Sequence, residues 1–226
     1  MPIARSTVVG ATTGVLLLAG AVGFGVGLPK VVDDAAAVSS ADLPTLPDRL
    51  DDRMIALSAV TAEDAGLTDQ ADLEAVQQVA DRAADGDTEA SSNLATIYGA
   101  AQVRAYVDAK VMGQSDAQSA PAQLAVTVTP GGAGLVIPSG PFAIDQQGGS
   151  HYELREIGGH RCAVAWQESV DPTTGLPTGE EVPAANYQAE CRAESDGLSY
   201  DVYATGLAPD EVASYVDRVL ELAAKG

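Results

Sequence analysis

The feature that most constrains this chain is a change in its hydrophobic period near residue 102. Over 103–111 and again over 124–128, apolar residues occupy alternate positions. Alternation with a period of two is typical of strands that bury one face. Pro130-Gly131-Gly132 ends the second segment, and the stretch 131–150 after it is predicted to be a long loop or an irregular sheet edge. We therefore expect an antiparallel meander sheet within residues 102–226.

A first hairpin is predicted around Gly158-Gly159, where two registers compete. A two-residue loop places a polar set on the face of the first cysteine: His151, Glu153 and Arg155 with Cys162, Val164 and Trp166. A three-residue loop, which adds His160, shifts the pairing by one residue and puts Tyr152 and Leu154 on that face instead. Because the second register buries more apolar surface, we expect the three-residue loop.

A second hairpin is predicted at Asp196-Gly197, a dipeptide that strongly favours a two-residue turn between strands. Such a turn sets three pairs: Cys191 with Val202, Ala193 with Tyr200, and Arg192 with Asp201. The first two pairs fall on the face expected to be buried. The third falls on the outer face, where we expect an exposed cross-strand pair of arginine and aspartate.

The chain has two cysteines, Cys162 and Cys191, and both are predicted to point to the buried face. An even number of cysteines predicts a disulfide in a chain that is exported, as the N-terminal segment described below indicates for this one. The bond would close a loop of 30 residues (191 − 162 + 1) and stabilise the fold by about 3.5 kcal/mol. A two-cysteine metal site is the alternative, but such sites usually have more ligands and the chain has only two histidines.

A C-terminal helix is expected from Pro209, with acidic residues in its first turn and Lys225 in its last. Its apolar residues form one continuous stripe: Val212, Tyr215, Val216, Val219, Leu222 and Ala223. This stripe can cover the inner face of the sheet. The predicted fold class is α+β, with the sheet packed against the C-terminal helix.

The N-terminus contains an uncharged apolar run, residues 7–28, which is long enough for a helix that spans a membrane. We expect residues 1–29 to be a transmembrane anchor, with Arg5 on the cytoplasmic side and everything after the run outside. The alternative is a cleaved signal segment, for which Ala35-Ala36-Ala37 offers a small-residue site. Both alternatives export the rest of the chain.

Between the anchor and the sheet, we expect a linker over 30–46 and an acidic, Ala-rich helical region over 47–101. Pro47 is a helix-start signal, and a short apolar stripe follows it: Leu50, Met54, Leu57 and Val60. The clearest helix runs from about residue 68 to 85, with Gly86 as its stop and a shorter helix after it.

These pieces together resemble uncharacterised single-pass extracytoplasmic proteins of actinobacteria. The residues that carry the resemblance are the strand Cys162-Ala163-Val164-Ala165-Trp166, the second cysteine, Cys191, and the segment Gly206–Val212, which leads into the last helix. The resemblance implies a place in the cell envelope. It brings no assigned activity and no catalytic or binding residues.

Composition excludes several classes of function. With 32 acidic against 12 basic residues and a formal charge of −20, the chain is a poor candidate for nucleic-acid binding. None of the common hydrolase, phosphate-binding or zinc motifs is present, so we predict no catalytic residues, cofactor or metal. Only 4% of residues are aromatic, which argues against a glycosidase cleft.

Three local patterns have simpler explanations than a functional site. His151 and His160 would lie roughly 20–25 Å apart along the first hairpin, too far for one metal ion, so we expect exposed histidines at the turn and the strand edge. The acids around Gly86 do not fit a calcium loop and suit a helix end better. Leu176-Pro177-Thr178-Gly179 lacks one residue of a sortase signal and lies in the loop 169–185.

The function we expect is a non-catalytic, membrane-anchored extracytoplasmic module that binds or scaffolds a protein of the cell envelope. The loops 131–150 and 169–185 are candidates for the binding surface. One alternative is a secreted small-ligand-binding domain, with a pocket between the sheet and the C-terminal helix. Another is an envelope enzyme that uses paired carboxylates.

Overall fold

The computed structural model describes residues 43–112, 120–132, 134, 144–145 and 149–225. The strands are β1 (Met54–Ala56), β2 (Gln102–Asp108), β3 (Gln123–Pro130), β4 (Ile144–Asp145), β5 (Ser150–Ile157), β6 (His160–Gln167), β7 (Tyr187–Ser195) and β8 (Leu198–Thr205). The helices are α2 (Gln70–Tyr98), the single turn α3 (Ala109–Met112) and α4 (Pro209–Ala223). Two short 3-10 turns cover Leu57–Ala59 and Ala184–Asn186.

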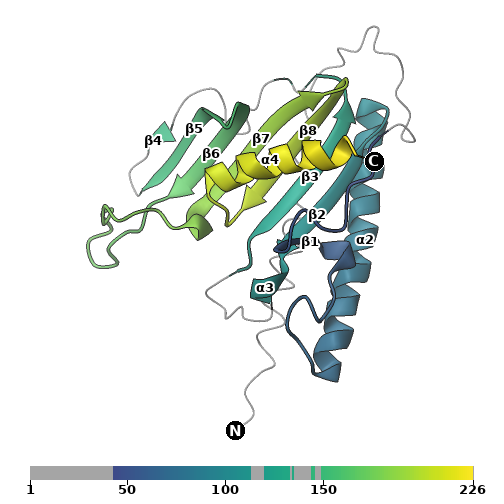
Figure 1. The fold of residues 1–226 in the computed structure, drawn as a ribbon. Coiled ribbons are helices and arrows are strands. Elements are labelled where there is room, and N and C mark those ends of the chain that lie inside the picture. Colours follow the sequence, from purple (N-terminus) through teal and green to yellow (C-terminus); the bar gives the residue numbers. More distant parts are fainter. Residues whose placement is uncertain (1–42, 113–119, 133, 135–143, 146–148, 226) are drawn as a thin grey trace.

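The described strands form one antiparallel sheet in the order β1-β2-β3-β8-β7-β6-β5-β4 (Figure 1). The α+β class is confirmed, but the sheet is not a simple meander. After β3 the chain goes to the far edge of the sheet and returns strand by strand, so that β8 closes against β3. The last strand is thereby placed in the centre, with both of its neighbours paired over seven or more residues.

Helix α4 covers one face of the sheet, as predicted, and its apolar stripe packs against β6, β7 and β8 (Figure 1). The largest core lies there. It joins Val212, Val216 and Val219 of the helix to the inward residues of the central strands. Burial of this stripe at about 25 cal/mol per Å² is the main force that fixes the helix on the sheet.

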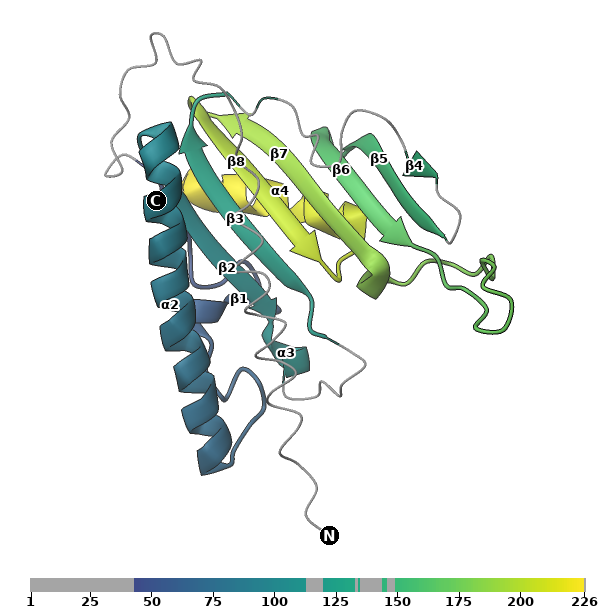
Figure 2. The same ribbon diagram turned by 180° about the vertical axis from the view of Figure 1, so that it is seen from behind.

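Helix α2 lies against the opposite face, at the β1–β2 end (Figure 2). The prediction of two helices separated at Gly86 is wrong, because one helix runs through this residue to Gly99, where a φ of 82° ends it. A glycine inside a helix costs about 1 kcal/mol. Here Asp87, the next residue, holds the helix to the sheet by accepting hydrogen bonds from Ala105 N (3.1 Å) and Ser58 Oγ (3.2 Å).

The segment 43–60, predicted as linker and helix, instead consists of bends and irregular backbone with β1 and one 3-10 turn, and its apolar residues enter the cores on both faces of the sheet. Its stripe is buried as expected, with Leu50 and Met54 at 0% exposure. The backbone turns back on itself, because Asp51 Oδ1 accepts hydrogen bonds from the backbone N of Arg53 (2.8 Å) and of Met54 (2.6 Å). This turn brings β1 beside β2. The buried apolar residues were therefore identified correctly, but the helical period assigned to them was wrong.

The register chosen for the first hairpin is also wrong. Ile157 pairs with His160 around a two-residue loop, and both glycines adopt the positive φ that this loop requires (60° and 82°). Tyr152 therefore points to the face opposite α4, where it is buried against Ala163. Leu154 remains 43% exposed.

The second hairpin is confirmed in every predicted pair, with Asp196 and Gly197 in the turn. Strand β2 ends at Asp108, three residues earlier than predicted, because the chain enters α3.

Among the described residues, no helix is long and apolar enough to cross a membrane. The predicted anchor, residues 7–28, lies outside the described residues.

Candidate functional site

Strand β7 presents different chemistry on its two faces. On the α4 side, Cys191 lies directly opposite Cys162 of β6 with a Cα–Cα distance of 4.1 Å, and the two form the predicted disulfide. Both cysteines are at most 2% exposed. Glu190 and Arg192, on either side of Cys191, point to the opposite face of the sheet. Each face carries an arginine bound to two carboxylates, and these two clusters are the candidate sites.

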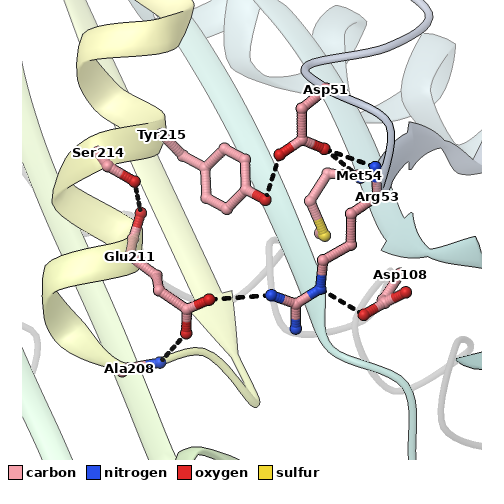
Figure 3. Close-up of polar contacts among 8 residues, drawn as sticks. All are labelled: Asp51, Arg53, Met54, Asp108, Ala208, Glu211, Ser214 and Tyr215. Carbon is pink, nitrogen blue, oxygen red and sulfur yellow. Dashed lines mark hydrogen bonds and ion pairs between the residues drawn. The ribbon is translucent and has the colours of Figure 1, made fainter.

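The Arg53 cluster lies on the α4 face and comprises Arg53, Asp108, Glu211, Asp51 and Tyr215 (Figure 3). Arg53 Nε donates to Asp108 Oδ2 at 2.5 Å, and Arg53 Nη1 donates to Glu211 Oε1 at 2.9 Å. The side chain of Asp108 is only 5% exposed. One guanidinium thus joins the segment before β1, the end of β2 and the first turn of α4.

The other carboxylate of the cluster, Asp51, is held ionised by hydrogen bonds. Burial opposes its ionisation, but bonds from Met54 N, Tyr215 Oη (2.8 Å) and Arg53 N outweigh burial and lower its pKa. Burial, followed by the bond to Asp51, raises the pKa of Tyr215. The bond to Asp108 raises the pKa of Arg53 against the effect of burial. These groups keep fixed charges near neutral pH, which suits a structural role.

Glu211 also has a second role at the start of α4. Its Oε2 accepts a hydrogen bond from Ala208 N at 3.0 Å, which caps the helix (Figure 3). The sequence analysis did not find the Arg53 cluster. Arg53 and Glu211 are 158 positions apart, and the segment that contains Arg53 was predicted to be helical.

The Arg192 cluster lies on the opposite face and comprises Arg192, Glu190 and Asp201. Arg192 Nε donates to Asp201 Oδ2, and Arg192 Nη2 donates to Glu190 Oε1 at 2.7 Å. The predicted pair of Arg192 with Asp201 is confirmed, but the prediction that it is exposed is wrong. All three side chains are largely buried, at 29% exposure for Arg192, 15% for Glu190 and 21% for Asp201.

The electrostatics of this second cluster favour one bound proton. Burial, followed by the negative charge of Asp201 and a hydrogen bond with it, raises the pKa of Glu190 to about 8. The pKa of Arg192 is raised by the two carboxylates, although its burial opposes this. Tyr203, opposite Glu190, has a pKa raised by burial and by the charge of Glu190. Strongly shifted groups of this kind are concentrated at functional sites.

The histidines are not exposed, contrary to prediction. His160 is 9% exposed, and its Nε2 lies 2.8 Å from Oδ1 of Asp217 on α4. His151 stacks on Trp166, with ring centroids 4.8 Å apart, and its Nε2 is 3.3 Å from Glu168 Oε1. Both rings therefore contribute to packing between strands or between the sheet and α4.

The described residues contain no group of three or more His, Cys, Asp or Glu side chains that could hold a metal ion. The acids around Gly86 lie on a continuous helix, so they form neither a calcium loop nor the helix end predicted for them.

The loop between β6 and β7 projects beyond the end of the sheet in both views (Figures 1 and 2). Its backbone is fixed by its own hydrogen bonds. Asp171 Oδ1 accepts from Thr173 N and Thr174 N, each at 2.8 Å, and Asp171 N donates to Leu176 O at 2.9 Å. Val170 also forms a β-bridge with Pro177. The loop displays two apolar side chains, Leu176 at 64% exposure and Val170 at 42%.

Comparison with known proteins places this chain in no family. No protein-family model matches it, and neither a curated protein nor a solved structure shows significant similarity to it. The chemistry of the described residues is therefore the basis for a functional proposal.

Proposed function

We propose that this chain is a non-catalytic extracytoplasmic protein, anchored by residues 7–28, that binds another protein of the cell envelope through the loop 169–185. The observation that carries the proposal is the projecting loop with Leu176 and Val170 on its surface. An oxidising compartment outside the cell agrees with the disulfide between Cys162 and Cys191.

The loop has two properties expected of a binding element. Its internal hydrogen bonds fix its shape before a partner arrives, so less conformational entropy is lost on association. It also holds two of the five large apolar side chains that are exposed among the described residues. Exposed apolar groups on a projecting loop favour a protein contact over bulk water.

The charge of the loop indicates which charged residues the partner's surface should carry. Between Arg161 and Arg192 the sequence has no lysine or arginine, while acidic residues occur at 168, 171, 180, 181 and 190. The proposed partner therefore has an apolar pocket for Leu176 and Val170 with lysine or arginine side chains around it. Such charge complementarity accelerates association and selects the partner.

The alternative of a small-ligand pocket under α4 has less support. Val202, Val212 and Val216 lie between the sheet and the helix, and all three are 0% exposed. The alternative of a carboxylate enzyme would use a pair such as Glu190 and Asp201. Both carboxylates already bind Arg192, and the proposed function does not involve them.

A photo-crosslinking amino acid in place of Leu176, in the full chain and in its native membrane, tests the proposal. We expect one discrete adduct with a single envelope protein, and we expect Val170→Asp to abolish it. The matched control puts the same amino acid at Gln78, an exposed position of α2, which should give no adduct. Equal adducts from both positions, or none from position 176, would contradict the proposal. The mass of the mature N-terminus separately distinguishes an anchor from a cleaved signal.

A further inference from the structure

The Arg192 cluster has two carboxylates for one guanidinium, and the described residues opposite it on the neighbouring strands do not balance this charge. Two carboxylates, Glu190 and Asp201, share one guanidinium, and all three side chains are at most 29% exposed. With both carboxylates ionised, the cluster carries a net charge of −1 in a largely buried place. A buried unbalanced charge is costly, and a carboxyl group in that position tends to bind a proton.

The neighbouring strands present few other charges to this cluster. Tyr203 of β8 lies opposite Glu190, and Thr127 of β3 lies opposite Asp201. From β6, Ala163 lies opposite Glu190, and Arg161 lies opposite Arg192. Arg161 binds Glu194 of β7, with Nη2 to Oε1 at 3.2 Å. The described neighbours thus add one cation and one anion that already bind each other.

We propose that the Glu190–Arg192–Asp201 cluster is a one-proton switch: a proton shared by the two carboxyl groups locks the β7–β8 pairing, and its release loosens this pairing. With the proton bound, one carboxyl group donates a hydrogen bond to the other and the cluster is neutral. Without it, two carboxylates repel each other across adjacent strands while Arg192 binds both of them. This inference is independent of the proposed partner of the loop 169–185.

The position of the cluster determines what the switch changes. Strands β7 and β8 lie in the middle of the sheet and support α4 on the other face (Figures 1 and 2). Gly134, which follows β3, lies close to the same face, because its carbonyl O accepts a hydrogen bond from Arg161 Nη1 at 2.7 Å. Loosening the hairpin therefore changes the polar face of the sheet, while the disulfide at Cys191 keeps β6 and β7 together.

The direction of the pH effect follows from linkage. The pKa of Glu190 is about 8 in the folded chain and near its ordinary value, 4.5, in the unfolded chain. The stabilisation from the bound proton is then complete below about pH 4.5 and is lost as the pH rises toward 8. Over that interval the unfolding constant of the wild type should rise up to tenfold per pH unit relative to a variant without this carboxyl group.

The experiment measures unfolding of the full chain by urea from pH 5 to 9, for the wild type, Glu190→Gln and Glu194→Gln. Glu190→Gln keeps a hydrogen-bond donor and removes the charge. Glu194→Gln is the matched control, because Glu194 is on the same strand and face but its side chain is 51% exposed. We expect the wild type and the control to lose stability with rising pH, and Glu190→Gln to exceed both at pH 8–9.

Carboxyl carbon NMR of the full chain provides a second measurement that does not depend on the stability of the variants. Glu190 should titrate near pH 8 in the wild type. In Asp201→Asn, which removes the neighbouring charge, its midpoint should fall by at least one pH unit. A Glu190 midpoint near 4.5 in the wild type, or the same pH profile of stability for Glu190→Gln and the wild type, would overturn the proposal.

Discussion

Each face of the sheet carries an arginine that binds two carboxylates, and the two clusters are built differently. In the Arg53 cluster, Asp108 and Glu211 come from β2 and α4, and the Arg53 side chain is 38% exposed. In the Arg192 cluster, both carboxylates come from one hairpin, and the Arg192 side chain is 29% exposed. The first cluster joins distant segments, and the second lies within a local element.

Burial raises the pKa of both Asp51 and Glu190, and the number of donors decides whether this rise is outweighed. Asp51 accepts two backbone N–H groups and a tyrosine hydroxyl, and its pKa is lowered. Glu190 has one guanidinium that it shares with Asp201, and its pKa is raised to about 8. Two sites with the same residue types can therefore respond to pH in opposite directions. Loss of stability in acid should come from the Arg53 side, and loss in alkali from the Arg192 side.

The largest expected effect comes from the disulfide, which lies behind the Arg192 cluster on the same strand. The double variant Cys162→Ala, Cys191→Ala should lower the free energy of unfolding by about 3 kcal/mol, because it reopens a 30-residue loop in the unfolded chain. Urea unfolding at pH 6 measures this change. The wild type in the presence of reductant is the control and should show a similar loss. A loss below about 1 kcal/mol in both would show that the strands do not need the bond.

Arg53→Ala should have the next largest effect, about 2 kcal/mol after allowance for the partial exposure of Arg53. The variant leaves the carboxylate of Asp108, which is 5% exposed, without its guanidinium. Urea unfolding at neutral pH is again the measurement. The control is Arg161→Ala, which removes an arginine that is 52% exposed and whose carboxylate partner, Glu194, is 51% exposed. This control should leave stability unchanged, and equal effects of the two variants would refute the structural role of the Arg53 cluster.

The two clusters also show what a sequence can predict. The pair of Arg192 with Asp201 was predictable because the Asp196-Gly197 turn fixes the register and the partners are nine positions apart. The Arg53 cluster was not, since its partners are 55 and 158 positions away and meet only when the sheet closes β8 against β3.

The first hairpin shows a second limit of sequence analysis. Its register was chosen to bury Tyr152 and Leu154 beside Cys162, but both faces of this sheet bury apolar residues. Tyr152 is buried on the far face and Leu154 stays 43% exposed. The turn geometry at Gly158 and Gly159, which both have a positive φ, predicts the register of this hairpin better than the count of apolar residues does.

Tyr215→Phe should have a smaller effect, about 1 kcal/mol at neutral pH, because it removes one hydrogen bond to a carboxylate. Its pH dependence is more informative. Since the folded pKa of Asp51 is lowered, its stabilisation is present above the ordinary value near 3.8 and is lost as the pH falls through the folded value. Thermal unfolding from pH 2 to 7 should therefore show a smaller acid-induced loss for Tyr215→Phe than for the wild type. The same acid-induced loss in both would mean that Asp51 does not depend on this hydroxyl.

The smallest expected effect concerns the ion pair of Arg161 and Glu194, which borders the Arg192 cluster. Both side chains are about half exposed, at 52% and 51%, and solvent-exposed pairs of this kind contribute less than about 1 kcal/mol. Arg161→Gln should therefore change the unfolding free energy by less than about 0.5 kcal/mol, and 0.5 M salt should reduce even this difference.

The variant still sharpens the comparison, because it removes a cation that faces the Arg192 cluster from β6. If the carboxyl pair depends on Arg192 alone, as the charge count requires, the Glu190 midpoint measured by NMR should stay within about 0.3 pH units in Arg161→Gln. A larger upward shift of the Glu190 midpoint would mean that charges elsewhere on this face of the sheet also set the protonation of the pair. The switch would then include residues beyond Glu190, Arg192 and Asp201.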